Sequence, residues 1–244
     1  MSNVYWAEPW LPRFLQQLDN LDYPKDRIQY SFSCAPHPDN TMKILTKWLE
    51  DKDNYYLRMT KMPKNWHTRR RMWTASNYSR RFAVMDSPEQ DKVEYIFHSD
   101  SDVVSIPPDT LKRLVALDVD IVHPYIYVEK THIFYDSYSF RYMYGPYANV
   151  WPPPPHWADW YKQNIGKPDV HADMEKRVIP MKSVGANPIL IKREVMDNVW
   201  YDGVSNEAIV GFCNLARQKG YKIWSYPDIE CLHSYDSIYS RPDV

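Results

Sequence analysis

The chain has 244 residues, 30 Lys and Arg, 31 Asp and Glu, and a formal net charge of -1. This length suits one large α/β domain, or two small ones, with a core that needs neither a metal nor a disulfide. The neutral balance argues against a protein that coats nucleic acid with its whole surface, although it permits a local basic groove. The six Gly fit neither G-x-G-x-x-G nor G-x-x-x-x-G-K-[ST], so the sequence disfavours Rossmann dehydrogenases and P-loop NTPases.

The cysteine content and the N-terminus bear on the cellular compartment. Cys34, Cys213 and Cys231 are odd in number and far apart, and no C-x-x-C is present, so we expect neither a disulfide framework nor a zinc knuckle. Residues 1–6 lack the basic and apolar regions of a signal peptide, and no stretch approaches the roughly 18 apolar residues of a membrane span. We therefore expect a cytoplasmic protein with no membrane span.

Short apolar runs alternate with helix-length segments, which is typical of β-α-β units and a largely parallel sheet. In chain order, the patterns predict a strand at 3–6, a helix at 10–18, a strand at 28–33, a helix from 41 to 49, a strand at 55–59, a helix at 73–85, a strand at 93–98, a helix at 107–117, a strand at 120–127, a strand at 183–192, a helix at 206–219 that stops at Gly220, and a strand at 221–225. The sequence shows no internal repeat and no linker between autonomous domains.

Two stretches lack regular periodicity. Residues 61–71 are basic, and we expect them to form a mobile or ligand-facing loop. Residues 128–180 contain a proline run at 152–155 and are predicted to be an irregular insertion that lines one side of a cleft, with no promise of a packed core. The expected single domain thus consists of a nucleotide-sugar-binding half at 1–127, this insertion at 128–180, and an acceptor-side half at 181–244.

The sharpest local feature is Asp100-Ser101-Asp102, which follows the apolar strand at 93–98. Ligands of open α/β sheets bind outside the carboxyl ends of the strands. Two carboxylates at i and i+2 can share Mn²⁺ or Mg²⁺, which would neutralise the charge on a departing diphosphate. The alternative is an Asx turn or a helix cap before Pro107, and the position after a buried strand makes the two readings about equal.

With its flanking strand, this motif resembles the D-x-D motif of GT-A glycosyltransferases, which use nucleotide-sugar donors and a divalent metal. The resemblance covers about residues 3–127 and 181–235. It implies a GT-A type, Rossmann-like open sheet that is mostly parallel and flanked by helices. It also implies donor contacts by Asp100 and Ser101, and a metal site of Asp100, Asp102 and His233, which stands after the last strand.

Other segments fall in the order of the same family. Glu8 lies in a segment that resembles the loop bordering the nucleotide base, and Asp39 opens a D-x-T stretch similar to that after the second strand. The acidic pair usual at the end of that strand is replaced by Ser33-Cys34. The segment 18–26 is most similar to fungal mannan polymerase mannosyltransferases and more loosely to procollagen galactosyltransferases.

The acceptor side is expected in the C-terminal half. Residues 185–194 resemble the acceptor-side strand that precedes a helix, and Asn187 is a candidate acceptor contact. Glu207 is the first candidate for the carboxylate that takes the proton of the attacking hydroxyl, with Asp202 as the second. The alternative for Glu207 is a charge that favours the helix dipole.

Arginines and aromatic residues complete the candidate site. Arg80 and Arg81 could reach the phosphates bidentately, as could the arginines at 69–71, although solvated surface is the alternative for both groups. Trp151 and Trp157 are candidates for a wall that stacks on the acceptor sugar, although each one alone is more often a packing residue.

The sequence therefore predicts a metal-dependent glycosyltransferase that moves a hexose from a UDP- or GDP-sugar to a hydroxyl. The acceptor is expected to be a glycan. The segment bounded by Lys61 and Trp73 would also suit DNA with hydroxyl-bearing modified bases, in a bacterial or virus-infected cell. The alternative from another class is a non-catalytic nucleotide-sugar or glycan-binding module, which the Ser33-Cys34 replacement favours. A nucleotidyltransferase is a weaker reading, because the segment 6–10 has no Gly.

Overall fold

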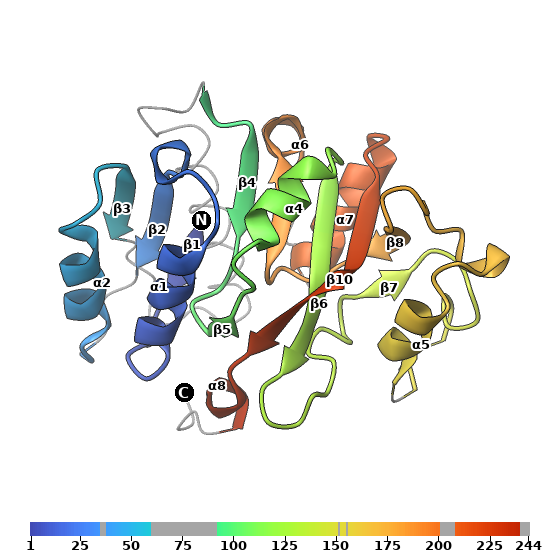
Figure 1. Ribbon diagram of the computed structural model, residues 1–244, viewed down its shortest axis with the longest axis horizontal. Helices are drawn as coiled ribbons and strands as arrows, with labels where there is room; N and C mark the ends of the chain where they lie inside the picture. The colour runs from blue at the N-terminus through green and yellow to red at the C-terminus, as the bar shows by residue number, and fades with distance from the viewer. Residues whose placement is uncertain (35–37, 60–91, 151, 155, 201–207, 240–244) are drawn as a thin grey trace.

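The computed structural model describes residues 1–34, 38–59, 92–150, 152–154, 156–200 and 208–239. The predicted helix at 73–85 and the basic segment 61–73 lie outside these residues. The described chain forms two sheets with helices on both faces, an α/β architecture as predicted (Figure 1).

The N-terminal sheet is parallel throughout and has the order β1-β2-β3. Its strands are β1 (Ser2–Val4), β2 (Tyr30–Cys34) and β3 (Tyr55–Met59). The connecting helices are α1 (Leu11–Asn20) and α2 (Thr41–Leu49), and a single 3-10 turn, η1 (Lys25–Arg27), precedes β2. Four apolar residues of α1 are buried, namely Leu11, Phe14, Leu15 and Leu18, so the predicted helical spacing is confirmed.

The second sheet is mixed, with the order β4-β9-β6-β10-β8-β7 and with β5 paired to β10. Its strands are β4 (Tyr95–His98), β5 (Val103–Ser105), β6 (Ile121–Val128), β7 (Arg141–Tyr142), β8 (Ile179–Ser183), β9 (Ile189–Lys192) and β10 (Ile223–His233). Within this sheet β6 and β10 are parallel, and the other pairs are antiparallel. The expectation of a mostly parallel sheet therefore holds for the first sheet and for the centre of the second.

The helices of the second half cover opposite faces of this sheet. They are α4 (Thr110–Ala116), α5 (Trp157–Gln163), α6 (Arg193–Asn198), α7 (Ala208–Gln218) and α8 (Tyr235–Tyr239), with a 3-10 turn η3 (Pro168–Val170). One core cluster joins α1 and α4 to Val122 and Ile126 of β6, and the other joins α6 and α7 to Ile121 and Tyr125 of the same strand. Alternate residues of β6 thus supply both cores, as the two-residue period of a strand requires.

Hydrogen bonds through the first residue join the two sheets. The Met1 amino group donates to the Phe97 carbonyl at 2.7 Å, and the Ser99 amide donates to the Met1 carbonyl at 3.1 Å. The carboxyl ends of β1, β2, β4, β6 and β10 lie along one edge of the molecule, at the bottom of Figure 1.

Two predicted strands have different bounds in the structure. The strand expected at 183–192 is two strands, β8 and β9, and the loop between them contains Gly185. The strand expected at 221–225 extends to His233, because β10 shifts register against β6 between Tyr226 and Glu230. That irregularity accommodates Pro227, which cannot donate to a regular ladder. α7 is followed by Gly220 at a φ of +90°, as predicted for a helix end.

The insertion at 128–180 forms a packed core, contrary to the prediction. It contains β7, α5 and η3, and its buried aromatic residues include Phe134, Phe140, Tyr142, Trp157 and Tyr161. The rings meet mostly edge to face, and Tyr142 stacks on Tyr161 at 3.4 Å. Aromatic side chains bury enough area to order a segment without periodic secondary structure. Among the described residues, no helix has the length and apolarity to cross a membrane.

We predict that Phe140→Ala lowers the free energy of unfolding by about 3–5 kcal/mol, the usual cost of removing a buried ring. Urea denaturation measures this change. Tyr138→Ala is the control, since Tyr138 is 61% exposed on the same segment, and it should change stability by less than about 0.5 kcal/mol. Similar effects of the two substitutions would show that this segment is not part of the core.

Candidate functional site

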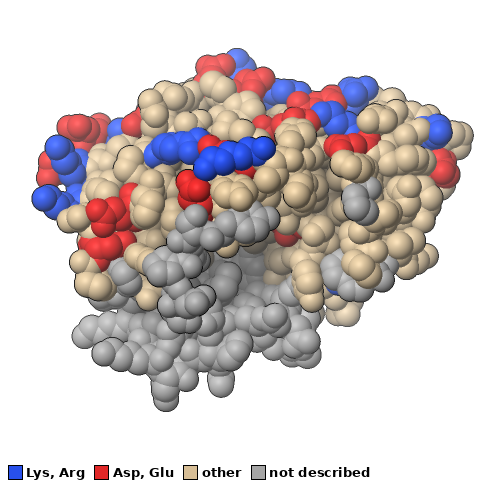
Figure 2. Space-filling model, turned by 90° about the horizontal axis from the view of Figure 1, so that it is seen from below, with Lys and Arg blue, Asp and Glu red and all other residues tan. Residues whose placement is uncertain are grey.

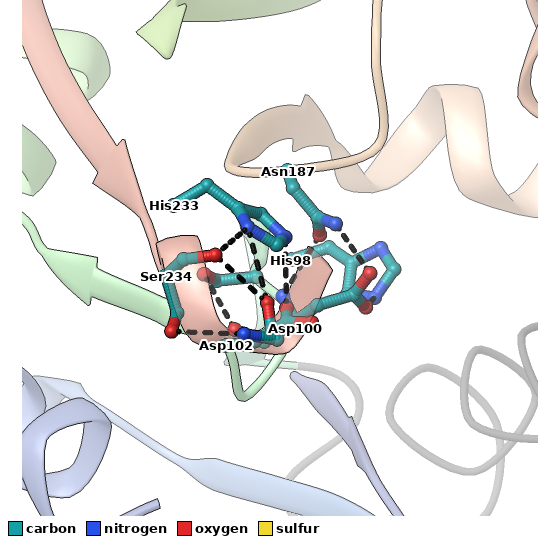
Figure 3. Close-up of polar contacts among 8 residues, drawn as sticks. His98, Asp100, Asp102, Asn187, His233 and Ser234 are labelled. Carbon is teal, nitrogen blue, oxygen red and sulfur yellow. Dashed lines mark hydrogen bonds and ion pairs between the residues drawn. The ribbon is translucent and has the colours of Figure 1, made fainter. Parts of the chain in front are cut away.

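The D-x-D segment forms a turn between β4 and β5 at the carboxyl edge. The Val103 amide donates to the Asp100 carbonyl at 3.3 Å, which closes the turn. Both carboxylates stay accessible, with the Asp100 side chain 33% exposed and that of Asp102 15% exposed. The buried strand before the turn and the short strand after it therefore fix where these two charges lie (Figure 3).

His233 reaches the same turn from the end of β10. In the β5/β10 ladder, His233 lies opposite Val103, and the Ser234 amide donates to the Asp102 carbonyl at 2.8 Å. The His233 Nε2 atom lies 3.3 Å from Asp102 Oδ1. Strand pairing thus brings together two residues that the sequence resemblance assigned to one metal site.

The ring of His233 is held in a defined orientation. It stacks on Tyr135 with ring centroids 3.7 Å apart. Its Nδ1 atom lies 3.1 Å from the Ser234 carbonyl oxygen and 3.3 Å from the Ser237 hydroxyl. A proton on Nδ1 would be donated to the carbonyl, which leaves Nε2 as the atom turned toward Asp102.

The two carboxylates also change the protonation of His233. Burial disfavours the charged imidazolium, but the contact with Asp102 and the proximity of Asp100 outweigh burial and raise the pKa of His233 above its ordinary 6.5. The same negative potential would attract a divalent cation.

Asp100 is fixed by Asn187 from the loop between β8 and β9. The Asp100 amide donates to Asn187 Oδ1 at 2.8 Å, and Asn187 Nδ2 donates to Asp100 Oδ2. The other oxygen of Asp100 lies 3.5 Å from Nε2 of the buried His98, at the end of β4. Asn187 was predicted to contact the acceptor, but its side chain is engaged with the D-x-D turn.

The donor set has the chemistry that Mn²⁺ or Mg²⁺ takes, with carboxylate oxygens and one imidazole nitrogen. The buried His233 Nε2 atom makes no well-aligned hydrogen bond, so this nitrogen could serve as the imidazole ligand of a metal. Within the described ranges, however, no three His, Cys, Asp or Glu side chains already converge on a common point. In this conformation Asp102 pairs with His233 while Asp100 pairs with Asn187, so metal binding would require the two carboxylates to turn toward each other.

Glu8 and Asp39 lie together at the carboxyl ends of β1 and β2. Glu8 accepts from the Asn40 amide at 2.8 Å and from the Asn40 side chain at 2.7 Å. Asp39 accepts from the Thr41 hydroxyl at 2.7 Å, and that hydroxyl accepts from the Ala7 amide at 2.8 Å. These bonds tie the loop after β1 to the start of α2, and those from Asn40 hold the pKa of Glu8 below its ordinary value.

The remaining predicted residues divide into two groups. Ser101 is buried within the turn. Trp157 is 5% exposed and packs against Phe134, Phe140 and Tyr142, so its assignment to an acceptor wall is wrong for this conformation. The predicted residues that lie outside the described part of the chain are Arg80, Arg81, Trp151, Asp202 and Glu207.

Three contributors were not found from the sequence: His98, Tyr135 and Ser237. His98 directly precedes the D-x-D segment in the chain, so its place at a strand end was a usable signal. Tyr135 belongs to the aromatic insertion, where nothing distinguishes it from its neighbours. Ser237 lies on the short helix α8, where its hydroxyl reaches His233. The sequence predicted no helix after the strand at 221–225.

Comparison with known proteins places this site in a family context. The family model described as Glycosyltransferase family 25, N-terminal domain, matches residues 5–144. Procollagen galactosyltransferase 1-A of Xenopus laevis is 33% identical over 129 residues, which is 48% of this chain and 21% of that protein. Human procollagen galactosyltransferase 2 is 31% identical over 127 residues, or 47% and 20%. The chain thus spans about a fifth of the length of these relatives.

A glycosyltransferase 25 family member of Aedes aegypti extends the similarity to 82% of this chain and 31% of that protein, at 24% identity. Solved structures show the GT-A fold over nearly the whole chain. S. aureus TarS 1–349 in complex with UDP-GlcNAc has a TM-score of 0.60 at 14% identity and covers 100% of this chain and 58% of that one. The mannosyltransferase PcManGT from Pyrobaculum calidifontis, in complex with GDP-Man and Mn²⁺, has a TM-score of 0.58 at 15% identity and covers 95% and 55%.

We predict that Asn40→Ala raises the pKa of the Glu8 carboxyl toward its ordinary 4.5, because it removes the side-chain hydrogen bond that favours the charged form most and leaves only the bond from the backbone amide. Since the folded pKa is depressed, these bonds stabilise the fold above the ordinary pKa, and that contribution is lost as the pH falls through the folded value. NMR titration of the Glu8 carboxyl carbon measures the shift. An identical titration curve in the variant would show that Asn40 does not act on Glu8.

Proposed function

The chain belongs to glycosyltransferase family 25, and from this premise we propose that it transfers a hexose from a nucleotide-diphosphate sugar to a hydroxyl acceptor with the help of a divalent metal. One observation carries the proposal: Asp102 and His233, far apart in sequence, lie 3.3 Å apart beside Asp100 at the carboxyl edge of the sheet. This is where α/β sheets bind ligands. Asp100 and Asp102 fall within residues 5–144, the segment that the family model matches.

Asp100, Asp102 and His233 would hold Mn²⁺ or Mg²⁺, which when bound neutralises the charge that develops on the diphosphate leaving group. The protein's own contribution is to keep the donors in place. The Tyr135 stack and the Ser234 carbonyl orient His233, and Asn187 restrains Asp100. Such supporting contacts usually matter as much as ligand identity.

The loops after β1 and β2 are suited to hold the nucleoside of the donor. Their mutual hydrogen bonds order Glu8 and Asp39 before any ligand arrives, which lowers the entropic cost of binding. Arg80 and Arg81 remain proposed phosphate contacts. Glu207, with Asp202 as the second choice, remains the proposed acceptor-side carboxylate, and Trp151 a proposed acceptor contact.

A hydroxyl-bearing glycan is the proposed acceptor class, and a UDP- or GDP-sugar the proposed donor. The related enzymes are named procollagen galactosyltransferases, and the structural neighbours hold UDP-GlcNAc and GDP-Man. Galactose, N-acetylglucosamine and mannose donors therefore all belong in a first screen. DNA is less favoured as an acceptor, because acidic and basic side chains are interspersed over the described part of the carboxyl-edge face (Figure 2). A DNA site would depend on the segment 61–73.

One observation favours a binding module without catalysis. β2 ends in Ser33-Cys34 where the resemblance calls for acidic residues. Cys34 is fully buried, and burial together with the charge of Asp39 raises the pKa of its thiol to about 12. The end of β2 therefore offers no carboxylate to a ribose, and Glu8 and Asp39 would have to serve instead.

We predict that the protein releases nucleoside diphosphate from one of UDP-galactose, UDP-glucose, UDP-GlcNAc or GDP-mannose in the presence of Mn²⁺, and that EDTA abolishes the release. Asp102→Ala should lower this rate at least about 100-fold, because the loss of several kcal/mol of charge stabilisation costs two or more powers of ten in rate. A coupled assay for the released diphosphate measures both effects.

Asp22→Asn is the matched control, since Asp22 is an exposed carboxylate that pairs with the exposed Lys112 at 3.2 Å. It should retain wild-type turnover. Undiminished turnover in Asp102→Ala would contradict the proposed site, whereas donor binding without release from any donor would favour the binding module.

A further inference from the structure

A further carboxylate, Asp136, lies next to the loop between β8 and β9. This is the loop whose Asn187 binds Asp100 of the D-x-D turn. Gly185 opens this loop, and a methyl group on its Cα would fall 1.1 Å from Asp136 Oδ2 and 2.2 Å from Asp136 Cγ. No side chain can occupy that space while Asp136 keeps its place. Gly185 is therefore required for close approach and not for its backbone angles, since its φ lies outside the left-handed region.

A single residue separates Gly185 from Asn187, which contacts the site. Asn187 follows Gly185 by two residues, is 6% exposed, and engages Asp100 through both its amide oxygen and its amide nitrogen. If Asp136 shifts, Gly185 loses its support and Asn187 can move away from Asp100. A displacement well below 1 Å is enough to break paired hydrogen bonds of this kind.

His123 supports the loop from the sheet side. It lies in β6, is fully buried, and places its Nε2 atom 3.7 Å from Asp136 Oδ2. Burial lowers the pKa of His123 to about 4, although contacts with the backbone of Pro124 and Asn187 oppose this shift. At neutral pH His123 is thus an uncharged side chain that lies against both Asp136 and the backbone of Asn187.

Asp136 also belongs to the segment that holds the other half of the site. Its neighbour Tyr135 stacks on His233. The Asp136 carbonyl accepts hydrogen bonds from the Ser139 and Phe140 amides at 3.2 and 3.0 Å, and these anchor the segment to the aromatic core. Two consecutive residues thus brace the two sides of the site, Tyr135 toward His233 and Asp136 toward Asn187.

We propose that Asp136 is a positioning residue that acts through Gly185 and Asn187 to set the orientation of Asp100 for the divalent metal. The proposal rests on the proposed function, because it requires that Asp100 takes part in metal binding. Asp136 itself is not assigned a contact with the metal or with a substrate.

Mn²⁺ binding, followed by electron paramagnetic resonance of the free ion, tests this role without relying on turnover. Loss of a supporting contact usually weakens metal affinity by 10- to 100-fold, so Asp136→Ala, which removes the contact, and Gly185→Ala, which displaces Asp136, should both weaken Mn²⁺ binding by about tenfold or more. Asp136→Asn keeps the size of the side chain and removes only its charge, so it should have little effect. A loss in Asp136→Asn as large as that in Asp136→Ala, with no loss in Gly185→Ala, would indicate a charge effect and overturn the positioning role.

The route through Asn187 is tested by a double-mutant cycle. Asn187→Ala should weaken Mn²⁺ binding by itself, and adding Asp136→Ala should cause little further loss, because residues that act through one contact are not additive. Losses that multiply in the double variant would overturn the proposal.

Asp228→Asn is the control for general destabilisation. Asp228 is also a partly buried, ion-paired carboxylate, held by Arg177 at 2.5 Å on the same strand as His233, and its loss should lower thermal stability without changing Mn²⁺ affinity. Equal Mn²⁺ affinity of the wild type and Asp136→Ala would refute this inference alone. Failure of the wild type to bind Mn²⁺ would refute the metal site and the inference with it.

Discussion

Two carboxylates on one short turn repel each other, and the rest of the site is arranged around that repulsion. Asp100 and Asp102 are separated by a single residue and are both partly withdrawn from water. The protein offsets the unfavourable charge with an imidazole beside Asp102 and with an amide and a second imidazole beside Asp100. Each of these groups comes from a different strand or loop, so the charge is stabilised only when the whole sheet is assembled. A cation bound at this turn would relieve the same repulsion.

The aromatic insertion has a direct part in this arrangement. Its buried rings belong to one of the two cores, whereas Tyr135 of the same segment packs against the other core and stacks on the face of His233. The orientation of the imidazole consequently depends on a residue of the insertion as well as on the end of β10.

Features that depend on local sequence were predictable. The apolar spacing of α1, the helix end at Gly220 and the D-x-D segment after β4 each reflect a pattern within a few residues. The meeting of Asp102 with His233 was expected only from family resemblance, since no local pattern joins β5 to the end of β10. The contact of Asn187 with Asp100 was missed for the same physical reason, because it arises from the antiparallel pairing of β9 with β4. The extent of β10 was underestimated because Pro227 resembles a strand end unless an irregular register is known.

In the proposed function, the end of β10 and the D-x-D turn together form a divalent metal site for a nucleotide-sugar donor. The most direct measurement is an anomalous diffraction map from crystals grown with Mn²⁺ and UDP or GDP. We expect a manganese peak with Asp102 and His233 Nε2 at coordination distance, about 2.0–2.6 Å, next to the diphosphate of the nucleotide. A nucleotide bound at this edge with the manganese held elsewhere, or with His233 still paired to Asp102 and no metal between them, would contradict it.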